Sequence, residues 1–218
     1  MGENTWLQEA DVILVIDSDI PWIPMNNRPR ADARIFHIDV DVLKQNIGTF
    51  HLDAEIRAQA DGELALTAIL HEVEKLRSLT GVMTARKSKI ITAHEQWLAA
   101  LMDAEDPSKS PLITVPHVIS KLRKAVPPTT LFLNEGVSNY VPVWSHLLAT
   151  RPGSALTSGA SSLGWGLGAA IGASIGKGVV SGSKNELIVL IVGDGSFLFG
   201  VPSSAYWIAR RYDTVSAI

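Results

Sequence analysis

The feature of this sequence that most constrains its fold is a run of five β-prone apolar residues, 188–192, that leads directly into Gly-Asp-Gly-Ser at 193–196. Such a run is typical of a strand that is buried on both faces, as in a parallel sheet. Asp194 would then follow the carboxyl end of a central strand, where open α/β sheets bind their ligands. Gly193 and Gly195 permit a sharp turn and a close backbone approach. The stretch therefore predicts an α/β protein with a carboxylate site at this strand end.

A helix is expected soon after that turn, because residues 202–212 open with proline, which is favoured in the first turn of a helix. The acid between two glycines, the hydroxyl of Ser196 and a helix would together suit a phosphate group that carries its own divalent metal. Gly-Asp-Gly is also a common turn tripeptide, so this motif alone leaves a purely structural role open.

The preceding hundred or so residues alternate between expected strands and helices. After an amphipathic helix at 114–126, with Thr114 as its N-cap, we expect strands at 130–134, 154–157 and 186–192 and helices at 141–149 and 163–180. This alternation is typical of a parallel sheet with right-handed crossovers and helices on both faces. Three strand ends, near Glu135, Ser158 and Asp194, would then face one crevice.

The N-terminal part of the chain predicts half of a Rossmann-like sheet. We expect strands at 10–17, 34–39 and 55–60, followed by a helix at 63–79. A helix at 87–102 and an acidic, proline-containing tail read as a linker. The expected organisation is therefore a partial Rossmann-like domain at 1–79, a linker at 80–111 and a second α/β domain at 112–218.

Composition narrows the function classes. A hydrophobic content of 46% with 19% charged residues is ordinary for a globular protein, and the net charge of -3 gives no reason to expect nucleic acid or an anionic membrane as partner. No cysteine is present, which excludes disulfides and thiolate zinc sites. The N-terminus lacks a signal-peptide pattern, and the uncharged run near 152–176 is too rich in Gly, Ser and Ala for a membrane span. We expect an intracellular enzyme, cytoplasmic or organellar.

A second glycine-rich stretch, Thr-Ser-Gly-Ala-Ser-Ser-Leu-Gly-Trp-Gly-Leu-Gly at 157–168, carries a family resemblance together with the first. With both, the chain resembles the thiamine-diphosphate-dependent enzymes of the acetolactate synthase and pyruvate decarboxylase superfamily. Ala-Asp-Val at 10–12 and His-Ile-Asp at 37–39 resemble strands in the central domain of that family. The resemblance implies that 1–79 is the C-terminal half of the central domain and that 112–218 is the diphosphate-binding domain. It also implies truncation at both ends, because the family motif closes with an Asn-Asn pair that would lie beyond Ile218.

The resemblance implies a role for each part of the two stretches. Asp194 would bind Mg²⁺, and the backbone amides of Gly195 and Ser196, with the Ser196 hydroxyl, would hold the diphosphate. Leu163 would wedge beneath the bent cofactor and bond its aminopyrimidine together with the Ser161 carbonyl. The expected cofactor-binding residues are Gly136, Val137, Ser138, Ser161, Ser162, Leu163, Gly193, Asp194, Gly195 and Ser196.

The implied activity is that of a thiamine-diphosphate- and Mg²⁺-binding fragment of a 2-oxo-acid decarboxylating carboligase, similar to acetolactate synthase and hence a lyase or transferase. The family works as a homodimer or tetramer, and its activating Glu comes from the N-terminal domain of a partner subunit. That acid is not in this chain, so we expect no catalytic residue here and no activity of the chain alone. FAD, which the central domain holds in acetolactate synthases, is not expected, because residues 1–79 contain no glycine-rich phosphate loop. Asp17, His37 and Asp39 are expected to cap turns.

Other interpretations stay open. The chain also fits a benzaldehyde-lyase or 2-hydroxyacyl-CoA-lyase type of enzyme, or a non-catalytic interaction module. A dinucleotide-binding domain is a further alternative, but the glycines at 164–168 depart from Gly-x-Gly-x-x-Gly and no acid follows a second strand at the required place. Glycines recur every fourth residue from Gly164 to Gly176, a pattern that would also suit close helix packing.

Overall fold

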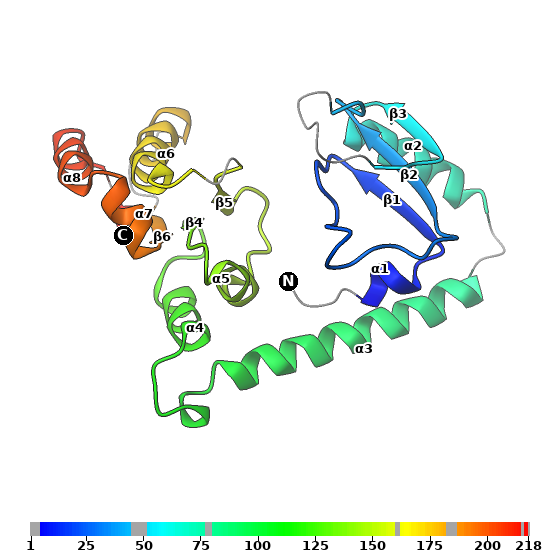
Figure 1. Ribbon diagram of the computed structural model, residues 1–218, viewed down its shortest axis with the longest axis horizontal. Helices are drawn as coiled ribbons and strands as arrows, with labels where there is room; N and C mark the ends of the chain where they lie inside the picture. Colours follow the sequence, from blue (N-terminus) through cyan, green and yellow to red (C-terminus); the bar gives the residue numbers. More distant parts are fainter. Residues whose placement is uncertain are drawn as a thin grey trace. The chain divides into compact units, whose positions relative to one another are not determined.

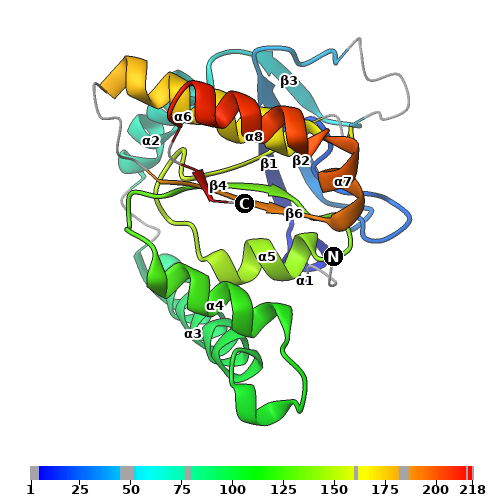
Figure 2. The same ribbon diagram turned by 90° about the vertical axis from the view of Figure 1, so that its left-hand side faces the viewer.

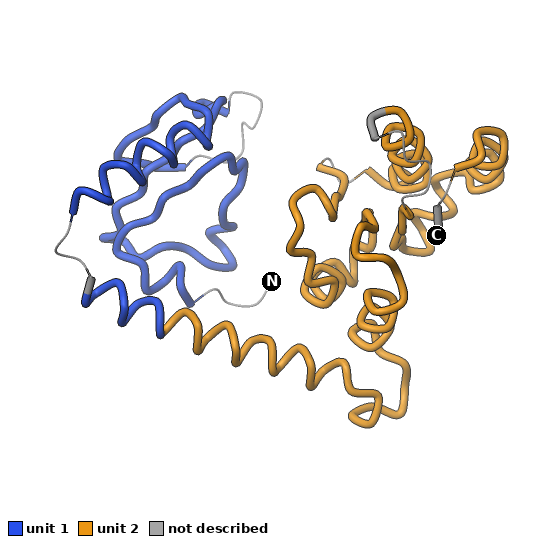
Figure 3. Tube along the Cα trace, turned by 180° about the vertical axis from the view of Figure 1, so that it is seen from behind, with its two compact units in different colours: residues 1–88 blue, residues 89–218 orange. Residues whose placement is uncertain are grey.

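A computed structural model describes residues 5–44, 52–76, 80–159, 162–181, 187–214 and 216–217. It divides into two compact units, Met1–Ser88 and Lys89–Ile218, with the boundary inside helix α3 (Thr80–Ala104; Figure 3). Each unit has its own parallel sheet, so the expected α/β class with parallel sheets and covering helices is confirmed. The assignment of 1–79, 80–111 and 112–218 to domains and a linker stays a prediction.

The first unit contains a three-stranded parallel sheet in the order β1–β2–β3 (Figure 1). Its elements are α1 (Thr5–Glu9), β1 (Val12–Ile16), β2 (Arg34–Asp39), β3 (Ile56–Gln59) and α2 (Gly62–Glu74). Helix α2 begins at Asp61, whose carboxylate accepts a hydrogen bond from the Leu64 amide at 3.0 Å and so satisfies one of the free N–H groups of the first turn. The strands lie where the apolar runs indicate, and α2 ends at Glu74 although its pattern predicts a helix as far as 79; residues 77–79 lie outside the described part.

The carboxyl end of β2 carries a buried polar cluster. Asp39 accepts a hydrogen bond from the Asp41 amide at 2.8 Å, which caps the following turn as expected. Burial would raise the pKa of Asp39, but the hydrogen bonds from Lys44 and from that amide lower it. His37 differs from the expectation, because within the described chain its ring nitrogens have no hydrogen-bond partner, and its Nε2 lies 3.7 Å from Asp39.

The second unit contains a four-stranded parallel sheet in the order β5–β4–β6–β7. Helices cover both of its faces, with α4 and α5 on one side and α6, α7 and α8 on the other (Figure 2). The elements after α3 are a 3₁₀ helix η2 (Pro107–Lys109), α4 (Val115–Ala125), β4 (Leu131–Glu135), α5 (Tyr140–Leu147), β5 (Ala155–Thr157), α6 (Trp165–Ser181), β6 (Ile188–Val192), α7 (Asp194–Phe199), α8 (Pro202–Arg211) and β7 (Ser216–Ala217).

The two central strands, β4 and β6, separate two hydrophobic clusters because successive side chains on a strand point to opposite faces. Leu133 and Leu190 pack under α6 and α8, whereas Phe132 and Val189 pack under α4 and α5. Each fully buried side chain of this size contributes about 1.5–3 kcal/mol through removal of apolar surface from water. The apolar run that opened the sequence argument is therefore a strand buried on both faces, as expected.

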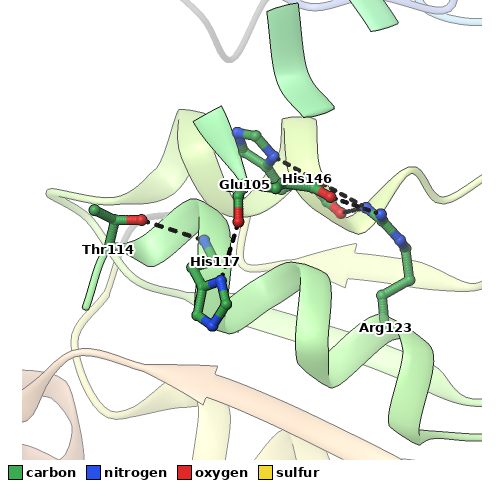
Figure 4. Close-up of polar contacts among 5 residues, drawn as sticks. All are labelled: Glu105, Thr114, His117, Arg123 and His146. Atoms are coloured by element: carbon green, nitrogen blue, oxygen red, sulfur yellow. Dashed lines mark hydrogen bonds and ion pairs between the residues drawn. The ribbon is translucent and has the colours of Figure 1, made fainter. Parts of the chain in front are cut away.

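A buried ionic network ties the end of α3 to the helices on one face of this sheet (Figure 4). Arg123 of α4 approaches both carboxylate oxygens of Glu105 at 3.2 Å, and Nδ1 of His146 in α5 lies 3.0 Å from the same carboxylate. The ring of His117 contacts the Glu105 carbonyl at 3.0 Å. The helix that contains His117 begins at Thr114, whose hydroxyl accepts the His117 amide at 3.3 Å, which confirms the expected N-cap.

Helix α7 differs from the expectation of a turn between β6 and the helix at 202. Gly193 is extended, and its carbonyl accepts a hydrogen bond from Phe197 at 2.9 Å, so the chain enters a helical turn at Asp194. Gly195 disfavours helix by about 1 kcal/mol relative to alanine, which is why propensity alone did not indicate this element. None of the described helices combines the length and the apolar character that crossing a bilayer requires.

Candidate cofactor site

The carboxyl ends of β4 and β5 border a pocket of about 300 Å³. Asn134 stands opposite Thr157 on one side and opposite Ile191 on the other in the strand register, so three strand ends meet at this edge, as expected. The connections that leave β4 and β6 lead to opposite faces of the sheet, which is the arrangement that opens a ligand crevice in α/β proteins (Figure 2). The pocket is lined by Asn134, Glu135, Gly136, Val137, Tyr140, Thr157, Ser158, Ser162 and Leu163.

A second pocket of about 250 Å³ adjoins the first, because Gly136 lines both. It extends along the end of β6 to Val192 and Gly193. The loop after β4 therefore lies between a space beside the Leu163 turn and a space beside the start of α7. The second pocket is otherwise lined largely by apolar residues of α4 and α5 and the stretch before α4, among them Ile113, Val118 and Val143.

The structure brings together part of the expected site. Four of the expected residues line the first pocket, namely Gly136, Val137, Ser162 and Leu163, and Gly193 lines the second. Ser138 continues the same loop but lines neither pocket. Ser161 lies outside the described residues. The roles of all these residues as cofactor ligands stay predictions.

The Gly-Asp-Gly-Ser motif forms the start of α7. Asp194 and Gly195 are exposed there, whereas Ser196 is buried with 4% of its surface accessible. Among the described residues there is no group of three or more His, Asp and Glu side chains that could hold a metal by themselves. A magnesium ion at Asp194 would therefore take most of its oxygen ligands from phosphate, water and further groups, which is how Mg²⁺ often binds with nucleotides.

Asn134 is a candidate ligand that the sequence did not single out. It is 1% exposed, and its Oδ1 accepts a hydrogen bond from the Gly136 amide at 3.0 Å. Its Nδ2 has no hydrogen-bond partner within the described chain, although the residue lines the first pocket. An unpaired buried donor costs about 1–3 kcal/mol, so the site fits a ligand with acceptor atoms, such as a diphosphate or an aminopyrimidine. Its position directly after the apolar residues of a strand was the signal available in the sequence.

Glu135 is the second residue whose part the sequence did not reveal. Its Oε1 accepts hydrogen bonds from the amides of Gly164 at 2.6 Å and Trp165 at 3.1 Å, and its Oε2 accepts one from Gly166 at 2.6 Å. Glu135 was expected in the loop after the strand, but it is the last residue of β4. Only 8% of its surface is accessible. The carboxylate therefore joins the end of β4 to the start of α6.

The turn after Leu163 also packs against the end of α7. Gly164 has φ of +88°, and a Cβ at this position would lie 3.0 Å from the backbone of Gly200. Only glycine combines that conformation with such a close approach at little cost. The second glycine-rich stretch thus packs closely against the residue that ends α7, the helix that the first stretch begins.

The remaining glycines of the four-residue repeat behave differently. A Cβ at Gly168, Gly172 or Gly176 would meet no atom within 4 Å, and all three are exposed. Of the four glycines in the repeat, only Gly164 is therefore closely packed in the described structure. The three that lie within α6 are not.

The fold and the site define a class of protein: a parallel α/β domain with a pocket at the carboxyl ends of its strands. Residues 136–216 match the family model of the thiamine pyrophosphate enzyme C-terminal TPP-binding domain. This region of the chain is therefore similar to the TPP-binding domain of thiamine-diphosphate-dependent enzymes. The expected resemblance to that family is confirmed for residues 136–216.

Two solved structures illustrate the similarity in fold. The thiamine diphosphate-dependent 4-hydroxybenzoylformate decarboxylase of Rhodococcus jostii RHA1 has 21% identity and a TM-score of 0.63, over 97% of this chain and 36% of that one. Benzoylformate decarboxylase from Polynucleobacter necessarius has 21% identity and a TM-score of 0.65, over 94% of this chain and 35% of that one. The chain thus spans about a third of the length of these enzymes. No curated protein sequence matches it.

Proposed function

We propose that the second unit binds thiamine diphosphate together with Mg²⁺, as part of an enzyme that decarboxylates a 2-oxo acid. The observation that carries the proposal is the meeting of the Gly136 loop, the Leu163 turn and the start of α7 at one edge of a parallel sheet, inside the region matched by the TPP-binding family model. In this proposal Asp194 holds the metal, and the β4 loop with the start of α7 holds the diphosphate.

The chain would contribute binding and orientation. The exposed Asp194 carboxylate is available to a metal, and Leu163, which is 47% exposed and lines the first pocket, is available to support the rings. The Asn134 amide would donate a hydrogen bond to the cofactor from the floor of the pocket. When bound, thiamine diphosphate supplies the electron sink for decarboxylation.

For the reaction that follows decarboxylation we propose two candidates. Carboligation of the acetolactate synthase type follows from the sequence motifs, whereas the names of the two solved structures favour simple decarboxylation of a benzoylformate-like acid. Both begin with loss of CO₂ from a 2-oxo acid, so the proposal commits to that class of substrate. Benzaldehyde-lyase and 2-hydroxyacyl-CoA-lyase activities remain alternatives within the family. A homodimer or tetramer, in which a partner subunit supplies the activating acid, completes the proposal.

The experiment that tests cofactor binding is calorimetric titration of thiamine diphosphate into the purified chain, with and without Mg²⁺. We expect saturable binding that requires the metal and that is lost in Asp194→Ala. Removal of a charged metal ligand should weaken binding at least roughly tenfold, because bonds to charged groups contribute about 1.5–3 kcal/mol.

Asp53→Ala is the matched control, since Asp53 is an exposed aspartate of the first unit with the same charge. The control should bind as the unaltered chain does. Binding that survives Asp194→Ala would remove Asp194 from the metal site. A folded chain that binds no thiamine diphosphate would favour the non-catalytic interaction module instead.

A further inference from the structure

We propose that Glu135 is a positioning residue for the cofactor, which fixes the Leu163 turn and fills the amino end of α6 with the protein's own anion. The inference rests on the proposed function for its cofactor half, and on the contacts of the chain alone for its structural half. As a consequence, the two helices differ in what their amino ends bind. The diphosphate would bind at the start of α7 and would be excluded from the start of α6.

The first step concerns the free amides of α6. A helix leaves four N–H groups without partners in its first turn, and these groups together attract anions. At α6 the carboxylate of Glu135 already accepts from the amides of Gly164, Trp165 and Gly166, at 2.6, 3.1 and 2.6 Å. Both carboxylate oxygens accept hydrogen bonds from these amides. The start of α6 therefore already interacts with an anionic group of the protein when no ligand is bound.

The second step concerns space. A Cβ on Gly166 would lie 2.6 Å from Oε2 of Glu135 and 2.7 Å from Leu190, so the carboxylate is enclosed against the helix backbone. Gly166 is buried, and Glu135 has 8% of its surface accessible. A phosphate group, which is larger than a carboxylate, has no room at this place without displacement of Glu135.

The third step concerns the neighbouring residue. Glu135 accepts hydrogen bonds from the three amides that follow Leu163, and Gly164 lies so close to the backbone of Gly200 that a Cβ would come within 3.0 Å of it. Leu163 itself stays exposed at the pocket. The turn is thus fixed on both sides while the residue expected beneath the cofactor rings faces outward, so a change at Glu135 would shift Leu163 without touching the ligand.

The test compares Glu135→Gln with the unaltered chain by amide hydrogen exchange and by calorimetry with thiamine diphosphate and Mg²⁺. Glutamine keeps the shape but turns one acceptor oxygen into an NH₂ group that opposes a backbone N–H, so at least one of the bonds is lost. We expect exchange at Gly164, Trp165 and Gly166 to become roughly tenfold to hundredfold faster without ligand, and the dissociation constant of thiamine diphosphate to rise about tenfold or more.

Glu105→Gln is the first control, because it removes another buried carboxylate of the same unit at a distance from the pocket lining. It should leave both the exchange of these three amides, relative to the rest of the unit, and the dissociation constant unchanged. Should Glu135→Gln fail to fold, Gly166→Ala against Gly168→Ala makes the same comparison. The Cβ of the former meets the carboxylate, whereas that of the latter meets nothing within 4 Å.

Each outcome decides. Unchanged exchange at the three amides overturns the positioning role of Glu135 altogether. Faster exchange with an unchanged dissociation constant overturns the link to the cofactor. If the unaltered chain binds no thiamine diphosphate, the proposed function fails together with the cofactor half of the inference, while the exchange rates still decide whether Glu135 holds the start of α6.

Discussion

At the scale of single residues, the site depends on backbone contacts as much as on side chains. Gly164 is the clearest case, because its positive φ and its contact with Gly200 both require the absence of a Cβ. Asn134 and Glu135 also fix the backbone around the pocket. The side chain of Asn134 accepts a hydrogen bond from a loop amide, and that of Glu135 accepts one from the amide just before α6. The geometry at the pocket is therefore set by groups that do not depend on a ligand.

We predict that Gly164→Ala destabilises the chain by about 1–3 kcal/mol, the usual cost of a non-glycine residue in a strained backbone region. Gly172→Ala serves as the control, because Gly172 is an exposed helical glycine with open space around it. That substitution should stabilise by roughly 0.5–1 kcal/mol, through the lower entropy cost of alanine in a helix. Urea unfolding curves measure both effects, and equal effects of the two substitutions would contradict the prediction.

Sequence patterns were informative about some site residues and silent about others, for a physical reason. Leu163 and Asp194 stand in glycine-rich stretches, whose composition marks a tight turn or a close approach whatever surrounds them. Asn134 and Glu135 are ordinary polar residues until the fold decides which amides face them. Their partners lie two and about thirty residues away, and the longer contact has no periodic signature in the sequence.

At the scale of elements, short-range chemistry predicted most helices and strands. The cap at Thr114 and the continuous apolar runs of β4 and β6 need no tertiary information. Several helices departed from expectation, among them α7, which contains a glycine that propensity disfavours, and α3, which begins at Thr80, seven residues before its expected start. Helix ends depend on caps and contacts, which is why element bounds are harder to predict than element types.

The ionic network at the end of α3 gives an element-scale prediction about acid. Burial would raise the pKa of Glu105, but hydrogen bonds from Ser120, His146 and Arg123 lower it to about 2. A carboxyl whose pKa is lower in the folded state adds stability above its unfolded value of 4.5, and this contribution disappears as the pH falls from about 4.5 towards 2. We therefore expect the free energy of unfolding to fall over this range more steeply in the unaltered chain than in Glu105→Gln.

Urea unfolding at a series of pH values measures this difference. Asp106→Asn is a suitable comparison, because Asp106 is next to Glu105 in the chain but is exposed. Its carboxylate accepts a hydrogen bond from the Ser108 amide. Its effect on the pH dependence should be smaller than that of Glu105→Gln. Parallel pH profiles for Glu105→Gln and the unaltered chain would show that the network does not couple folding to protonation.

At the scale of the whole molecule, the chain has two compact units, and the residues that line the first pocket all belong to the second unit, 89–218. The acid that lines the first pocket, among the residues described, is Glu135. Both of its oxygens accept backbone N–H bonds at the start of α6. Among the described residues that line this pocket, the single carboxylate is thus already engaged with the backbone of α6.

From this we predict that the 218-residue chain by itself releases no measurable CO₂ from pyruvate or benzoylformate, even with thiamine diphosphate and Mg²⁺ in excess. A coupled assay for CO₂, with a complete thiamine-diphosphate-dependent decarboxylase as positive control, is the measurement. Turnover by a pure sample that is lost in Asp194→Ala would contradict the prediction and would require an activating group within this chain.

The hydrogen bonds that the first amides of α6 donate to Glu135 affect how fast the site can bind a ligand. Because the amides of Gly164, Trp165 and Gly166 are bonded within the chain itself, that turn loses its conformational freedom when the protein folds and not when a ligand arrives. Sites that are ordered in advance avoid a slow rearrangement step, so their association rates depend on diffusion and orientation. Loading of the Leu163 side of the pocket should accordingly follow a single, concentration-proportional phase.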